Sequence, residues 1–105
     1  MANIDWNEIE KQAATLARTI LGGFVQQATN DAQAFRVRAE QQIASWLQEL
    51  RDGEITKKNF ESLVRGERDL AEMNALKQAG LAHAAVDAFT SGLMEIVVTA
   101  ALAAI

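Results

Sequence analysis

The chain has one histidine, His83, and no cysteine, so little metal or nucleophile chemistry is open to it. Without cysteine it has no thiol nucleophile, no cysteine-ligated zinc and no disulfide. A di-iron site in a helical bundle needs Glu-x-x-His on two helices, whereas Gly80 stands three positions before the single histidine. We therefore predict no metal site. We expect His83 on a polar edge of a helix, or hydrogen-bonded within a bundle.

The remaining polar residues do not form a catalytic pattern. None of the serines lies in a Gly-rich elbow, where a hydrolase places its nucleophile. The carboxylate pairs Glu8/Glu10 and Glu67/Asp69 are two positions apart and point to different sides of a helix. A Gly-rich phosphate loop after a strand is absent. The sequence therefore predicts a protein that is not an enzyme and has no cofactor.

The segment from Gln48 to Asn59 partly resembles the calcium loop of an EF-hand. Asp52, Gly53 and Ile55 match the pattern of that loop. Its first and twelfth positions, where the loop requires carboxylate ligands, are Gln48 and Asn59. We interpret the segment as a turn between two helices, because Asp-Gly is a turn signal.

Composition predicts an all-α protein. The chain of 105 residues holds twenty alanines and no proline, which gives a strong helix bias. A net charge of −4 argues against nucleic-acid binding, which uses a basic surface. The acidic, polar start lacks the basic and apolar regions of a signal peptide, so we expect a cytoplasmic protein.

Apolar residues recur at helical spacing on both sides of the Asp-Gly turn. The first stripe runs from Ile9 to Leu50 with a mean step of about 3.7 residues. The second runs from Phe60 to Ala104 and lapses near residues 67 and 68. We predict a single all-α domain over 1–105, an antiparallel hairpin with helix 1 at about 5–51, a turn at 52–56 and helix 2 at about 57–105. Each helix would be about 70 Å long.

An alternative breaks each long helix once. Asn30 or Asp31 could begin a new helix as its N-cap, and Gly80 could end one. The product is a four-helix bundle formed by a single chain. Its connections would be shorter than the 2–8 residues usual in bundles.

The apolar C-terminal segment indicates that a hairpin would need further helices to bury it. Its residues from Leu93 to Ile105 carry one charge, Glu95, and the apolar side chains surround most of the helix. A helix that is apolar all round must be buried all round, which one neighbour cannot achieve. We therefore predict that the hairpin self-associates into a four-helix bundle or higher oligomer, through an interface at Leu16, Ile20, Phe24, Val86, Phe89, Leu93, Val97 and Leu102.

A band of charges could fix how the helices align. Pairing about the turn places Arg38 and Glu40 opposite Glu67 and Arg68, where the apolar stripe lapses. One reading is an ion-pair layer that sets helix register or selects a partner. The other is a solvated surface that contributes little stability.

The functional prediction is a non-catalytic structural or interaction protein. A self-assembling hairpin would act as a scaffold, assembly factor or adaptor, as a homo-oligomer (simplest as a dimer) or with a related helical chain. One alternative is a membrane-active protein that inserts its apolar C-terminal helix, although the segment lacks basic residues. Another is a carrier that holds an apolar ligand between helices near Gly22 and Gly23.

Overall fold

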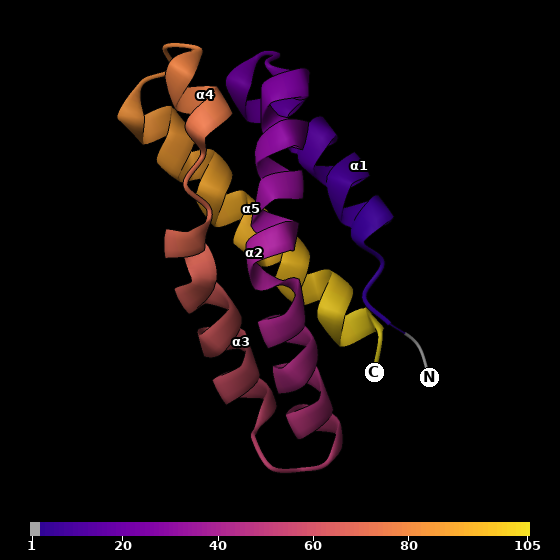
Figure 1. Ribbon diagram of the computed structural model, residues 1–105. Helices are drawn as coiled ribbons and strands as arrows, with labels where there is room; N and C mark the ends of the chain where they lie inside the picture. Colours follow the sequence, from indigo (N-terminus) through magenta and orange to yellow (C-terminus); the bar gives the residue numbers. More distant parts are fainter. Residues whose placement is uncertain (1–2) are drawn as a thin grey trace.

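The computed structural model describes residues 3–105, and every regular element within this range is helical (Figure 1). Two of the seven elements are single turns of another helix type, π in η1 and 3-10 in η2. In chain order the elements are α1 (Trp6–Leu16), η1 (Ala17–Leu21), α2 (Val25–Arg51), α3 (Lys57–Gly66), η2 (Glu67–Leu70), α4 (Asn74–Gln78) and α5 (His83–Ala103).

The helices surround one apolar core. Figure 1 shows the long α2 in front, α5 crossing behind it, α1 and α3 on the two sides, and α4 beside the upper end of α2. α1 packs against both α2 and α5, and α3 packs against the same two helices on the other side. Three fully buried phenylalanines, Phe35, Phe60 and Phe89, come from α2, α3 and α5. The all-α prediction is therefore confirmed.

The first predicted long helix is interrupted, and this part of the prediction was wrong. Gly22 and Gly23 follow η1 with φ of 68° and 143°, which glycine adopts without a Cβ penalty. Phe24 is also left-handed, with φ of 57°. The chain reverses there, so α1 folds back along α2. A chain 43 Å in its longest dimension has no room for the predicted helices of about 70 Å.

The second predicted long helix is also interrupted, at two places. Gly80, with φ of 87°, follows the end of α4, as the four-helix alternative predicted. The other interruption lies at residues 71–73, just after the lapse in the apolar stripe, and ends on Met73 with φ of 53°. The predicted break near Asn30 is wrong, because α2 runs through it without interruption.

The central turn is where the sequence placed it. α2 ends at Arg51, Gly53 takes a φ of 76°, and α3 begins at Lys57. The hydroxyl of Thr56 accepts the backbone N–H of Asn59 at 3.1 Å. This side-chain bond caps the first turn of α3 and satisfies a backbone donor that has no helical partner.

The apolar C-terminal helix is buried by its own chain. Its large side chains face the core, while α1 and η1 cover it on one side and α3 and η2 on the other. The residues that point outward include the small side chains of Ala84, Ala88 and Ser91. The need for more than one neighbour is thus met within one chain, without a second copy.

Candidate functional site

An uncharged surface lies where α1 and η1 run beside α5. Five of its residues line an open groove of about 330 Å³, and the side chain of Ile20, in η1, is 42% exposed one turn further along. No member of the surface is charged, although the chain has 24 charged residues, ten basic and fourteen acidic. We call it the α1–α5 face, and its residues are Gln12, Thr15, Leu16, Thr19, Ile20 and Ile96.

The floor of this groove depends on Gly92. A Cβ placed on Gly92 would lie 2.5 Å from Cδ2 of Leu16, so the leucine packs directly against the α5 backbone. Small residues permit such close packing between helices, and here the approach leaves Leu16 half-buried instead of covered. Gly92 therefore lets Leu16, which lines the groove, lie close to the α5 backbone.

The π turn of η1 shapes the upper end of the face. Single π turns are often found at functional sites. Here η1 passes into two positive-φ glycines and then into Phe24, whose side chain is 40% exposed. A bulky residue with positive φ is an uncommon, strained conformation. The result is a corner that presents Ile20 and Phe24 to solvent.

The structure divides the predicted oligomer interface into two groups. Ile20 and Phe24 are exposed, and Leu16 and Leu102 are half-buried. The other four residues of the predicted interface lie in the core of their own chain and offer no surface to a second copy in this arrangement. They are buried because α1 and α3 already shelter α5 on both sides. These four residues are Val86, Phe89, Leu93 and Val97.

The predicted polar layer forms only in part. Arg38 does reach across the fold: its guanidinium donates to the carbonyl oxygen of Leu70 at 3.1 Å and lies 3.4 Å from Glu72. Glu40 instead pairs with Arg36, four positions away on the same helix. Glu40 does not pair with residue 67 or 68, because the break after α3 changes how the following segment aligns with α2.

Glu67 and Arg68, the other half of that layer, lie in η2. Glu67 is half-buried, and burial raises the pKa of its carboxyl above the ordinary value of 4.5. Arg68 is exposed and lines a shallow cleft of about 230 Å³ with Lys77 and His83. Because acidic side chains line the same cleft, it offers no consistent charge to a ligand.

The shortest ion pair among the described residues was not predicted. Arg65 of α3 donates to both carboxylate oxygens of Glu95 on α5, at 2.7 and 2.9 Å. These hydrogen bonds lower the pKa of Glu95 and raise that of Arg65. The single charge of the apolar segment therefore links α5 to α3. The two residues are thirty positions apart, and no local pattern in the sequence joins them.

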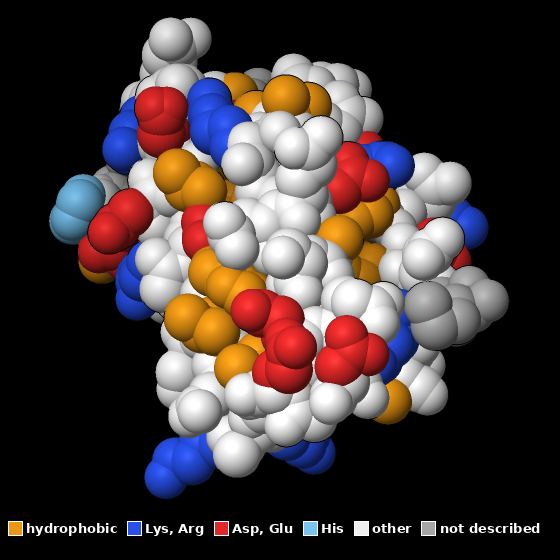
Figure 2. Space-filling model, turned by 60° about the horizontal axis from the view of Figure 1, so that its bottom comes forward, with side chains coloured by type: hydrophobic (Ala, Val, Ile, Leu, Met, Phe, Trp, Pro, Cys, Tyr) orange, Lys and Arg blue, Asp and Glu red, His pale blue; other side chains and the backbone are white. Residues whose placement is uncertain are grey.

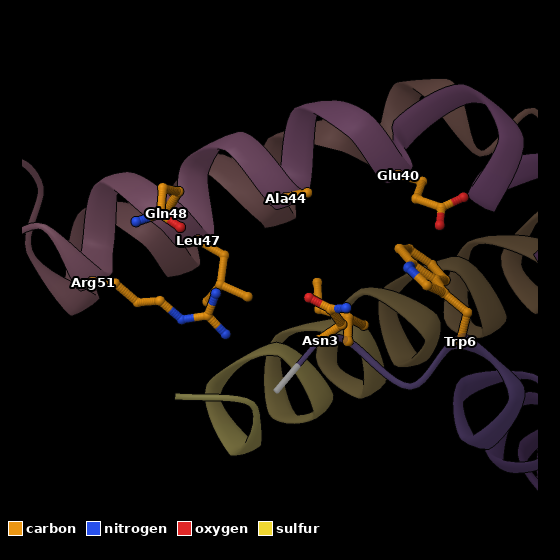
Figure 3. A pocket seen from close by; sticks show the side chains of 8 residues that line it. Asn3, Trp6, Glu40, Ala44, Leu47, Gln48 and Arg51 are labelled. Atoms are coloured by element: carbon orange, nitrogen blue, oxygen red, sulfur yellow. The ribbon is translucent and has the colours of Figure 1, made fainter. Parts of the chain in front are cut away.

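A second cleft lies between α2 and the chain before α1 (Figure 3). It has a volume of about 320 Å³, with Arg51 at one end and Glu40 and Trp6 at the other. Arg51 donates to the carbonyl oxygen of Ala104 at 2.8 Å, and the Arg36 guanidinium lies 5.9 Å from the ring centroid of Trp6. Trp6 is buried, so it is a core residue that covers this end of the bundle.

Charged side chains spread over the end of the molecule that carries the central turn. Figure 2 shows acidic and basic groups there, with apolar side chains in separate patches between them. Within residues 3–105 no three His, Cys, Asp or Glu side chains are grouped so that they could hold a metal ion. His83 is exposed on α5 and lies 3.2 Å from Asp87, one turn along the same helix, on the polar edge that the sequence suggested.

One described helix, α5, is long and apolar enough to cross a membrane, with a mean hydropathy of 1.5 in its most apolar window. Eight of its residues are buried inside the bundle, and core helices of soluble proteins pass the same criterion. The chain matches no family model, no curated protein and no solved structure.

Proposed function

We propose that the chain is a non-catalytic interaction protein, a helical bundle that associates with a second copy or a related helical chain and serves as a scaffold, assembly factor or adaptor. The observation that carries this proposal is the α1–α5 face, an uncharged groove beside the exposed Ile20. The face combines three apolar side chains, Leu16, Ile20 and Ile96, with uncharged polar ones, so a second chain could cover these residues without burying a charge among them.

The proposal differs from the hairpin in its driving force. In a bare hairpin the oligomer would be needed to bury the core, whereas here the chain buries Phe89, Leu93 and Val97 by itself. Association through a surface of half-buried and exposed side chains is therefore weaker. We expect a folded monomer in equilibrium with an oligomer, so that its apparent mass depends on concentration.

Light scattering of the purified protein at two concentrations, without detergent, tests the proposal. We expect a soluble species whose mass rises from monomer toward dimer as concentration increases. A constant monomer mass at both concentrations would contradict self-association. Aggregation that only lipid or detergent relieves would favour the second candidate function.

That second candidate is a membrane-active protein, and the observation that favours it is the length and hydropathy of α5. Its 21 residues span about 30 Å, the thickness of a bilayer core. Insertion would require α5 to leave α1 and α3 and to break the Arg65–Glu95 pair. Flotation with phosphatidylcholine vesicles, with and without phosphatidylglycerol, measures this activity directly.

A further inference from the structure

A short, strained hinge joins the first helix to the rest of the chain. Residues 3–21, which contain α1 and η1, form a segment that we call the N-terminal arm, and residues 22–24 separate it from α2. Both glycines of this hinge have positive φ, and so does the bulky Phe24, for which the conformation is strained. Short hinges under strain favour the exchange of a segment between two copies of a protein.

The sequence of the hinge also fits a continuous helix. Leu16, Ile20, Phe24 and Ala28 follow one another at four-residue steps, so a helix through the hinge would keep the apolar side of the arm in line with that of α2. η1 is already helical, and only residues 22–24 would have to change. The product would be one helix of about 70 Å in which Phe24 has an ordinary φ.

The surface that receives the arm is already present in each chain. The arm folds back along α2 and also packs on α5 (Figure 1). Trp6 lies against Phe35 of α2, with ring centroids 6.5 Å apart, and Leu16 lies against the backbone of Gly92 on α5. The arm's buried side chains are Trp6, Ile9, Ala13 and Ala17. An arm that swings out leaves these places open, and the arm of a second copy fits them by sequence.

Exchange preserves the packing and the charge environment of the arm. Each contact of the closed chain forms again between two copies, so the same apolar surface is buried. None of the charged side chains of the arm is buried in the closed chain. Because their surroundings on α2 and α5 are the same in both forms, the exchanged contacts bury no additional charge.

We propose that two copies of this chain exchange their N-terminal arms. In each copy residues 22–24 become helical, α1, η1 and α2 form one helix, and the arm packs on α2 and α5 of the other copy. This inference rests on the proposed function, because both require self-association, but its interface is the buried side of α1 instead of the α1–α5 face. The closed monomer and the exchanged dimer differ mainly in the hinge, so the hinge residues set the balance between them.

Alanine at both hinge glycines tests this balance. Alanine is disfavoured at positive φ and favoured in a helix, so Gly22→Ala/Gly23→Ala should raise the dimer association constant about a hundredfold or more after refolding. Analytical ultracentrifugation measures it. The matched control is Gly66→Ala, because Gly66 lies at the end of α3 without a positive φ and with open space around it. An association constant equal to that of the control would contradict arm exchange.

A comparison at Phe24 separates the backbone from the side chain. Phe24→Gly and Phe24→Ala both remove the half-exposed ring, so any surface contact of that ring is lost equally. Glycine accepts the positive φ of the closed hinge, whereas alanine favours the helix of the exchanged form. The alanine variant should therefore associate about tenfold more strongly than the glycine variant. Equal association of the two would show that the hinge backbone does not control the dimer.

A disulfide between two different variants tests the exchanged contact directly. The chain has no cysteine, and Cγ of Leu16, whose place a cysteine sulfur would take, lies 3.5 Å from a Cβ placed on Gly92. Leu16→Cys and a tagged Gly92→Cys protein are mixed in urea, refolded together and mildly oxidised. A covalent mixed dimer should be the main product, because Cys at 16 reaches Cys at 92 of another copy only through an exchanged arm.

The matched control replaces the Gly92→Cys partner with tagged Val37→Cys, whose native side chain on α2 is 84% exposed and so is not covered by the arm. This mixture should give little mixed dimer. If the two mixtures cross-link equally while the mass of the native chain still rises with concentration, arm exchange is wrong and association through another surface stands. If the native chain stays monomeric at every concentration, also after refolding from urea, both the inference and self-association are wrong.

Discussion

The carboxylate of Asp31 accepts the backbone N–H of Leu76 at 2.9 Å, a bond between residues 45 positions apart in the sequence. Its other oxygen accepts the N–H of Ala75, also at 2.9 Å. These are the donors that an N-cap side chain normally satisfies, but the cap position of α4 is Met73, which has no suitable oxygen. A residue in the second turn of α2 therefore caps α4.

Replacing Asp31 with alanine should destabilise the fold by about 1–3 kcal/mol, because two backbone donors lose their acceptor and one of them is buried. Asn should cost less, since its amide keeps one acceptor oxygen. Urea unfolding measures both. The neighbouring Asn30→Ala, whose exposed side chain bonds only with Gln26, is the control and should change the free energy of unfolding little. Equal losses at 30 and 31 would contradict the capping role.

Gly92 and Leu16 should show strong coupling. Alanine is better than glycine in a helix by about 1 kcal/mol, but the new Cβ would meet the Leu16 side chain. We expect Gly92→Ala to be close to neutral in the native background and to stabilise by about 1 kcal/mol when Leu16→Ala is also present. A double-mutant cycle in urea measures the difference. Equal effects in the two backgrounds would show that the two residues do not restrict each other.

Val97→Asp should unfold the chain at any concentration. The side chain is fully buried in the single chain, and an unpaired buried carboxylate costs several kcal/mol, comparable to the whole stability of a small domain. The control is Thr99→Asp, two positions along α5 on its exposed side. Circular dichroism should show lost helix only for the former. A folded, monomeric Val97→Asp protein would contradict the burial of residue 97 in the core of the single chain.

Two carboxyl groups should respond to pH in opposite directions. Hydrogen bonds from Arg65 lower the pKa of Glu95, so its contribution to stability is present above the ordinary 4.5 and is lost as pH falls through the lowered value. Burial raises the pKa of Glu67, so its carboxylate costs stability once pH rises past 4.5.

Glu95→Gln should therefore lower the urea midpoint near neutral pH, while Glu67→Gln should raise it. Each difference should shrink as pH falls through the folded-state pKa of the native carboxyl group, which lies below 4.5 for Glu95 and above it for Glu67, because the protonated group resembles the amide. Because Arg65 and Glu95 are largely exposed, added salt should reduce the first effect. Parallel shifts in the two variants would contradict the assigned causes.

The sequence predicted the helical secondary structure and the central turn, because both depend on local chemistry. Alanine content, the Asp52–Gly53 pair and the Thr56 cap act within a few residues, and the structure places the turn between Arg51 and Lys57. Gly80 was also a readable signal, since a helix commonly ends where glycine takes a positive φ.

The breaks at residues 22–24 and 71–73 were not predicted, because the apolar stripe continues through them in the sequence. Leu16, Ile20 and Phe24 keep helical spacing in the sequence, although a π turn and two left-handed glycines separate them in space. Met73 takes a positive φ that its side chain does not favour, and Asp31 satisfies the helix that follows. Such conformations depend on tertiary contacts. The same is true of the Arg65–Glu95 pair and of the hydrogen bond from Arg38 to the distant Leu70 carbonyl in the same chain.

The contact of Leu16 with Gly92 also bears on how fast the molecule forms. It joins segments about 76 positions apart, and α5 meets α1, η1 and α3 only after the intervening chain has been arranged. Closing so distant a pair carries a large entropic barrier, whereas most small helical bundles rely on neighbours in sequence. This bundle should refold more slowly than its helix content suggests. During synthesis, the part of the chain that precedes α5 would lack its central packing partner until α5 has left the ribosome.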